Sequence, residues 1–107
     1  MVNVVYHRKY HRLTVKGHAY SGESGYDLIC SACSILTYTL ASNVYNMNEN
    51  GQIRNIIVDL QPGNAVVSCN TNKKFKSIVT MIFDSICAGY ELLANDYPEN
   101  ITYEIRG

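Results

Sequence analysis

The feature that most constrains the fold is a long amphipathic segment in the C-terminal third of the chain. Apolar side chains recur there with the spacing of one helix face over about five turns, at Phe75, Ile78, Val79, Ile82, Phe83, Ile86, Tyr90 and Leu93. The pattern predicts a helix from about Lys73 to Asn95, with Thr71 or Asn72 as its N-cap and Pro98 beyond its end. Such a helix must bury its apolar face against another element.

An earlier segment has the same helical spacing. Between about Asp27 and Asn46, the residues that fall on one face are Ile29, Ala32, Cys33, Leu36, Leu40 and Val44. Asp27 is suited to the N-cap position. Residues 46–51, rich in asparagine and ending in Gly51, are expected to break this helix.

Five short segments have the composition or the alternation of β-strands, namely 2–7, 12–16, 52–60, 65–69 and 101–105. The sequence Gln61-Pro62-Gly63-Asn64 predicts a turn between the third and fourth of them. The element order is therefore ββαββαβ. The simplest arrangement is an α+β fold in which two amphipathic helices pack on one face of a largely antiparallel sheet. The other sheet face would need a partner, so we expect a homodimer.

Size and charge limit the possible functions. The chain has 107 residues, enough for a single domain (1–107) with its own core. Nine Lys and Arg balance nine Asp and Glu, so nucleic acid is not expected as the primary ligand. No apolar run has the length of a membrane span, and the first twelve residues do not resemble a secretory leader. We therefore expect no membrane association and a cytoplasmic location.

The four cysteines have several possible roles. Disulfides do not persist in a reducing cytosol. A structural zinc site usually needs two close cysteine pairs, and only Cys30 and Cys33 form one, so no metal and no other cofactor is expected. Cys33 shares the apolar face of its helix and is expected in the core. Cys69, in a strand, and Cys87, on the apolar side of the second helix, are expected to be packing residues.

Segment 17–34 contains the groups best suited to chemistry. His18 lies just after a predicted strand, and Cys30 follows twelve residues later, in what we expect to be the first turn of a helix. A helix N-terminus favours a thiolate, and its free N–H groups can donate to an oxyanion. A histidine can take the thiol proton and return it to a leaving amine. Glycines 17, 22 and 25 would let residues 19–26 form a mobile loop that closes over a substrate.

Each of these residues also has a simpler interpretation. A cysteine early in a helix is more often a small buried hydrophobic residue. A single histidine before a loop is often a solvated or capping group, and Asp27 is most simply a helix cap. Spacing alone therefore leaves the role of Cys30 and His18 open.

A wider pattern distinguishes these interpretations. The run Gly17-His18-Ala19, seven further residues, and Asp27-Leu28-Ile29-Cys30-Ser31-Ala32-Cys33-Ser34 resembles the signature of the ribosomal-processing cysteine protease family, Prp. Tyr97-Pro98-Glu99 is similar to the Tyr-Pro element of that family, so the resemblance covers nearly the whole chain. The chain departs from the pattern at Cys33, where the family has an aliphatic residue, and at Ser31, where it has alanine.

The resemblance implies a cytoplasmic bacterial cysteine endopeptidase that acts as a homodimer. Its substrate would be the precursor of large-subunit ribosomal protein number twenty-seven, from which it removes the N-terminal extension. The implied roles are Cys30 as nucleophile, His18 as general base, Asp27 and Ser34 as supporting residues, and Gly17, Ala19, Gly22 and Gly25 in the substrate loop.

Two other functions fit parts of the sequence. A redox protein could use Cys30 and Cys33, although this hypothesis does not explain His18. A non-enzymatic ribosome- or RNA-associated binding module could use the basic N-terminal hairpin, in which Arg8, Lys9, Arg12 and Lys16 alternate with Tyr6, His7, Tyr10 and His11. The simpler interpretation of that hairpin is a solvated surface.

Overall fold

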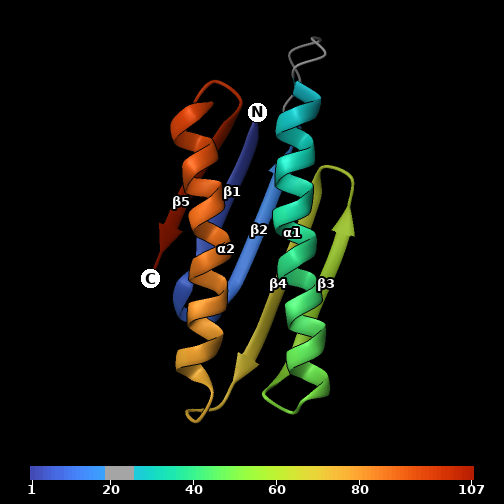
Figure 1. Ribbon diagram of the computed structural model, residues 1–107, viewed down its shortest axis with the longest axis vertical. Coiled ribbons are helices and arrows are strands. Elements are labelled where there is room, and N and C mark those ends of the chain that lie inside the picture. Colours follow the sequence, from blue (N-terminus) through green and yellow to red (C-terminus); the bar gives the residue numbers. More distant parts are fainter. Residues whose placement is uncertain (19–25) are drawn as a thin grey trace.

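The strands and helices follow one another in the predicted order. The computed structural model describes residues 1–18 and 26–107, with the backbone alone at Tyr26 and Asp27. A short 3-10 helix joins the first two strands (Figure 1). In chain order the elements are β1 (Val2–His7), η1 (Arg8–Tyr10), β2 (Arg12–Gly17), α1 (Tyr26–Glu49), β3 (Ile53–Gln61), β4 (Asn64–Thr71), α2 (Lys76–Asp96) and β5 (Ile101–Arg106).

The five strands form one mixed sheet with the order β3-β4-β2-β1-β5. Three neighbouring pairs are antiparallel, and β1 pairs with β5 in parallel. The register places Leu13 opposite both Tyr6 and Val67, so side chains from β1, β2 and β4 lie on the same face. The largely antiparallel sheet and the α+β fold predicted from the sequence are confirmed.

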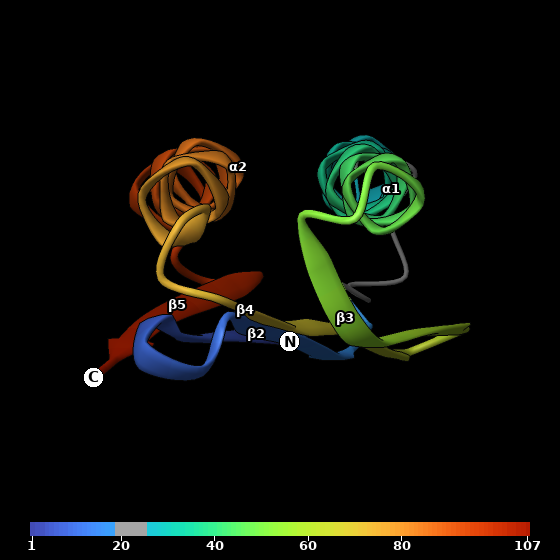
Figure 2. The ribbon, with the colours of Figure 1, turned by 90° about the horizontal axis from the view of Figure 1, so that it is seen from below.

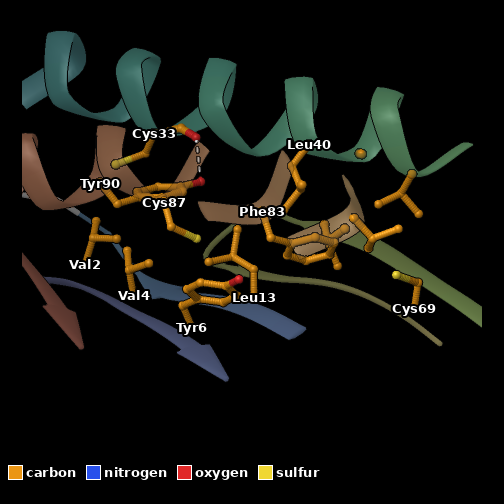
Figure 3. Close-up of a cluster of buried hydrophobic side chains, with 14 of the residues drawn as sticks. Val2, Val4, Tyr6, Leu13, Cys33, Leu40, Cys69, Phe83, Cys87 and Tyr90 are labelled. Carbon is orange, nitrogen blue, oxygen red and sulfur yellow. Dashed lines mark hydrogen bonds between the residues drawn. The ribbon is translucent and has the colours of Figure 1, made fainter. Parts of the chain in front are cut away.

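Both helices cover the same face of the sheet (Figure 2). Alternate residues of β1, namely Val2, Val4 and Tyr6, are buried on that face, as a period of two requires. The rings of Tyr6 and Phe83 stack with their centroids 6.0 Å apart (Figure 3). Each large apolar side chain buried in this way contributes about 2 kcal/mol to folding.

The first helix is longer than predicted. We expected a break at residues 46–51, but α1 continues to Glu49. Met47 is buried in the core, and its burial offsets the weak helix propensity of the neighbouring asparagines. The chain then leaves the helix at Gly51, which has a φ of 73°, in the left-handed region. The helix also begins one residue earlier than predicted, so Asp27 lies inside its first turn and is not the N-cap.

The second helix starts later than predicted, at Lys76 and not at Lys73. The side chain of Asn72 accepts a hydrogen bond from the backbone N–H of Phe75 at 3.3 Å. Asn72 therefore closes a turn ahead of the helix, and Phe75 occupies the N-cap position. The strand β3 is irregular where Asn55 adopts a φ of 52°, and its pairing with β4 shifts between Arg54 and Ile57.

Both long helices are apolar enough, and long enough, to pass a length-and-composition test for a membrane span, which we had not expected from the sequence. The segments that pass are Leu28–Glu49 and Lys76–Asp96. Each nevertheless packs its most apolar stripe onto the sheet, and core helices pass the same test. Helix length and composition are therefore weak evidence for a membrane here.

Polar contacts join the η1 region to α2. Asp84 accepts a hydrogen bond from the Tyr6 hydroxyl at 2.8 Å and binds the Arg8 guanidinium through both carboxylate oxygens. The Arg8 hydrogen bonds are the main reason that the pKa of Asp84 lies below its ordinary value. His11 is buried beside Phe83, with its Nε2 atom 2.7 Å from the Thr80 hydroxyl, and this burial lowers the pKa of His11.

Candidate active site

His18 is held where β2 ends, against the turn that joins β3 to β4. The backbone N–H of Gly17 donates to the carbonyl of Gly63 at 2.9 Å, and the ammonium group of Met1 donates to the carbonyl of His18 at 2.6 Å. Gly63 has a φ of 71°. A Cβ atom on Gly63 would lie 2.4 Å from Nε2 of His18, so the imidazole lies directly against the turn backbone.

Cys30 lies at the start of the second turn of α1 and is half-buried. The prediction that it lies in the first turn is wrong by one residue, because the helix begins at Tyr26. Only the first four N–H groups of a helix lack an intrahelical acceptor. The N–H of Cys30 is therefore used within the helix, and an oxyanion would need other donors. The helix dipole also weakens beyond the first turn.

His18 and Cys30 line the same pocket. This pocket has a volume of about 360 Å³ and lies between the end of β2, the N-terminal half of α1 and the β3–β4 turn. Ser34, one helical turn after Cys30, also lines it, as does Gly17. Two segments more than ten residues apart in the sequence thus meet at one cavity, which is the arrangement that the sequence suggested for them.

Sequence reasoning missed one wall of this pocket. Gln61, Pro62, Gly63 and Asn64 line it, although their pattern predicted only a turn. The turn reaches His18 because β2 pairs with β4, with Lys16 opposite Asn64. No local sequence pattern predicts the pairing of β2 with β4, because the pairing depends on which strands become neighbours in the sheet. Tyr38, two turns after Cys30 on α1, lines the pocket as well.

A buried hydrogen-bond network fixes α1 against α2 beneath the pocket. The Tyr90 hydroxyl donates to the backbone carbonyl of Cys33 at 3.2 Å (Figure 3). The Thr37 hydroxyl bonds the same carbonyl at 2.8 Å and also contacts the Tyr90 hydroxyl. A buried network whose groups are satisfied holds its elements rigidly. The network therefore fixes the turn of α1 that follows Cys30.

The other three cysteines are buried, as predicted for packing residues. Burial is the main cause that raises the pKa of Cys33 to about 11, that of Cys69 to about 11 and that of Cys87 to about 12. These thiols are therefore protonated at neutral pH. Cys33 lines the pocket with 5% of its surface exposed, which does not favour it as a partner in thiol–disulfide exchange.

Several predicted site residues lie outside the described part of the chain. They are Ala19, Gly22 and Gly25 of the expected substrate loop, and with them the expected mobility of residues 19–26. The side chain of Asp27, expected to support the site, is also outside it. Among the side chains that the structure does describe, no group of three or more His, Cys, Asp or Glu residues could hold a metal ion.

A thiol and an imidazole that share an open pocket are the two groups that nucleophilic catalysis by cysteine requires. The fold and pocket thus have the features of a thiol-dependent hydrolase. Residues 1–102 match the family model of the cysteine protease Prp. The chain therefore belongs to the Prp family of cysteine proteases.

Solved structures with similar folds include SMU.848 from Streptococcus mutans, at 25% identity and a TM-score of 0.61, covering 98% of this chain and 91% of that one. The ribosomal processing protease Prp from S. aureus, in complex with a covalently linked product peptide, is 18% identical with a TM-score of 0.69. The same protease in complex with a substrate peptide is 18% identical, with a TM-score of 0.67. Both comparisons cover 98% of this chain and 97% of the protease. A search of the curated proteins gave no match.

Proposed function

We propose that this protein is a ribosomal-protein processing endopeptidase that uses Cys30 as nucleophile and His18 as general base. Its proposed substrate is the precursor of large-subunit ribosomal protein twenty-seven, from which it removes the N-terminal extension, and its proposed location is the cytoplasm. The observation that carries the proposal is that His18 and Cys30 line one pocket in a chain that belongs to a cysteine protease family. The Prp structures from S. aureus with bound peptides support the choice of substrate class.

The proposed reaction has two steps. In the first, His18 takes the proton of the Cys30 thiol, and the sulfur attacks the scissile carbonyl carbon. As the tetrahedral intermediate collapses, the C–N bond breaks, and His18 gives its proton to the leaving amine. In the second, His18 activates a water molecule that hydrolyses the thioester, which releases the extension and restores the thiol.

Separate contacts in the fold support the position of each of these two residues. His18 packs against Gly63 of the β3–β4 turn, and Cys30 lies on a helix that the Tyr90–Cys33 hydrogen bond ties to α2. These contacts support the proposal because positioning of the reacting groups lowers the entropy cost of each turnover. We propose Ser34 and Asp27 as supporting residues of the same helix.

The proposal is tested by incubating reduced protein with the precursor ribosomal protein and following the precursor mass. Wild type should remove the extension, and Cys30→Ala and His18→Ala should be at least about 1000-fold slower. His7→Ala and Cys87→Ala serve as matched controls, because His7 lies on β1 and Cys87 is buried on α2, and neither residue lines the pocket. Cleavage by Cys30→Ala at the wild-type rate would disprove the mechanism. An unchanged precursor mass with wild type would disprove the substrate.

A further variant, Cys33→Ala, separates the protease from the redox alternative. A dithiol mechanism needs Cys33, whereas the proposed hydrolysis does not. Cleavage retained by Cys33→Ala would therefore exclude a mechanism that depends on the Cys30–Cys33 pair.

We also propose that the protein forms a homodimer. Among the described residues, the outward side of α1 carries four exposed large apolar residues, Leu28, Ile35, Tyr38 and Tyr45. The sheet face away from the helices is more polar, with Asn3, Lys16 and Thr102 in adjacent register positions. A dimer would thus be expected to use α1 in preference to the sheet. Light scattering should give twice the chain mass for wild type and a smaller mass for Ile35→Glu; a monomeric wild type would contradict the proposal.

A further inference from the structure

A second pocket lies at the end of the molecule away from His18 and Cys30. It has a volume of about 350 Å³ and is lined by Lys9 of η1, Arg54 of β3, Lys73 before α2 and Lys76 at its start. The strand β4 runs from Asn64 in the first pocket to Thr71 in the second, a distance of about 24 Å for an extended strand. Figure 1 shows the beginnings of α1 and α2 at opposite ends of the molecule.

The charges at this pocket are not balanced locally. None of its lining residues is acidic, and four of them are lysine or arginine. Among the side chains that the structure describes, the ion pairs are Arg8–Asp84 and Arg106–Glu104. The four lining cations therefore have no carboxylate partner in that part of the chain. Like charges gathered in this way repel one another until an anion binds between them.

This concentration of charge contrasts with the neutrality of the whole chain. The strand register places the end of β1, the start of β2, the start of β3 and the ends of β4 and β5 together. Eight of the nine Lys and Arg residues fall at these positions or at the adjoining η1 and start of α2: Arg8, Lys9, Arg12, Arg54, Lys73, Lys74, Lys76 and Arg106. The formal net charge of the chain is zero. Arg8 and Arg106 are paired with Asp84 and Glu104, and the other six leave a basic end on a molecule whose formal net charge is zero.

The groups around the pocket favour one kind of anion. Tyr10 lines it and is 63% exposed, with Nζ of Lys9 5.9 Å from its ring centroid. An exposed aromatic ring next to lysines is the combination by which proteins stack bases and neutralise the backbone of a single strand. The amide side chains of Asn70 and Asn72 add further hydrogen-bonding groups to the lining. A free phosphate or an acidic peptide would not need the exposed ring.

We propose that this pocket binds the phosphate backbone of a single-stranded nucleic acid, with Lys9, Arg54, Lys73 and Lys76 as phosphate contacts and Tyr10 as a stacking surface. The site is independent of the protease chemistry, since it shares no lining residue with the pocket of His18 and Cys30. In this protein, nucleic acid is a second ligand that anchors the molecule while the other end remains open to a polypeptide.

The test is fluorescence anisotropy with a labelled oligouridylate of about 12 nucleotides. Wild type should bind this strand. A plot of the logarithm of the affinity against the logarithm of the salt concentration should fall with a slope of about two to three, because three or four phosphates are neutralised. The double variant Lys73→Gln/Lys76→Gln should bind at least about tenfold more weakly and lower the slope by about one. Tyr10→Ala should weaken binding with little change in slope.

The controls separate the nucleic acid from other anions and from damage to the fold. Lys16 is the one Lys or Arg residue that lies outside the basic end, so the Lys16→Gln variant should bind the strand like wild type. Neutralising Lys76 should not destabilise α2, because a cation at a helix N-terminus opposes the helix dipole. The proposal is overturned if wild type does not bind the strand at about 50 mM salt, or if Lys16→Gln weakens binding as much as the double variant Lys73→Gln/Lys76→Gln. It is also overturned if inorganic phosphate or an oligoglutamate peptide binds as tightly as the strand. Cys30→Ala should bind unchanged, so this outcome is independent of cleavage.

Discussion

The imidazole of His18 lies against the backbone of Gly63, so closely that a Cβ atom on Gly63 would be 2.4 Å from Nε2. The two residues are far apart in the sequence and meet because β2 pairs with β4. Gly63 is therefore constrained twice, by its positive φ and by the ring beside it.

Replacing Gly63 by alanine should reduce proteolysis much more than it reduces stability. The added methyl group must displace the His18 ring, and a displacement of about 1 Å at a catalytic group can cost about 100-fold in rate. The backbone strain itself should cost about 1 kcal/mol. The loss of activity is measured as kcat/KM for precursor cleavage, and the loss of stability is measured by urea unfolding.

The chain offers a matched control at Gly51. It has a φ of 73°, nearly the same as that of Gly63, but a Cβ atom there would have nothing within 4 Å. Gly51→Ala should thus lose a similar amount of stability and keep its activity. Equal activity of the two alanine variants would show that the contact between Gly63 and His18 has no role in catalysis.

Thiol labelling should distinguish Cys30 from the other cysteines. Iodoacetamide at neutral pH should modify the folded protein once, at Cys30, because Cys33, Cys69 and Cys87 are buried and their pKa values are raised to about 11 or 12. Peptide mapping by mass spectrometry identifies the modified residue, and urea should expose all four. Modification of Cys33 as fast as Cys30 in the folded protein would contradict its placement in the core.

Mild acid should destabilise the fold through His11. Burial holds the pKa of His11 below its ordinary value of 6.5, so the unfolded chain binds a proton there that the folded chain does not. The contribution of His11 to stability is therefore most favourable above pH 6.5 and becomes less favourable as the pH decreases toward the lowered pKa. The free energy of unfolding should drop more for wild type than for His11→Gln between about pH 7.5 and about pH 5.5. Parallel pH profiles for the two proteins would show that His11 does not contribute.

The parts of the fold that depend on local patterns could be predicted from the sequence. The apolar spacing that includes Phe83 and Tyr90 indicated α2, and the alternation through Val2, Val4 and Tyr6 agrees with β1. Helix ends were less predictable. Met47 extends α1 because its core contacts are tertiary, and no pattern in the asparagine-rich segment reveals them.

The site was predictable only in part, for the same reason. The spacing of His18 and Cys30, together with a family resemblance, pointed to the two groups that line the pocket. The opposite wall, formed by the turn around Gly63, depends on strand order and was identified only as a turn. The basic pocket was indicated only in part. The N-terminal hairpin contains Lys9 and Tyr10, but Arg54, Lys73 and Lys76 come from elements that are distant in the sequence.

The most direct test of Cys30 as nucleophile is the intact mass of the protein during turnover. A peptide ester that carries the residues before the cleavage site of the precursor is mixed with reduced protein, and the reaction is stopped with acid. We expect one acyl group per chain, mapped to Cys30, absent in Cys30→Ala and formed at least about 100-fold more slowly in His18→Ala. An acyl group on another residue, or product release by wild type with no acylated protein at any time, would contradict catalysis by Cys30.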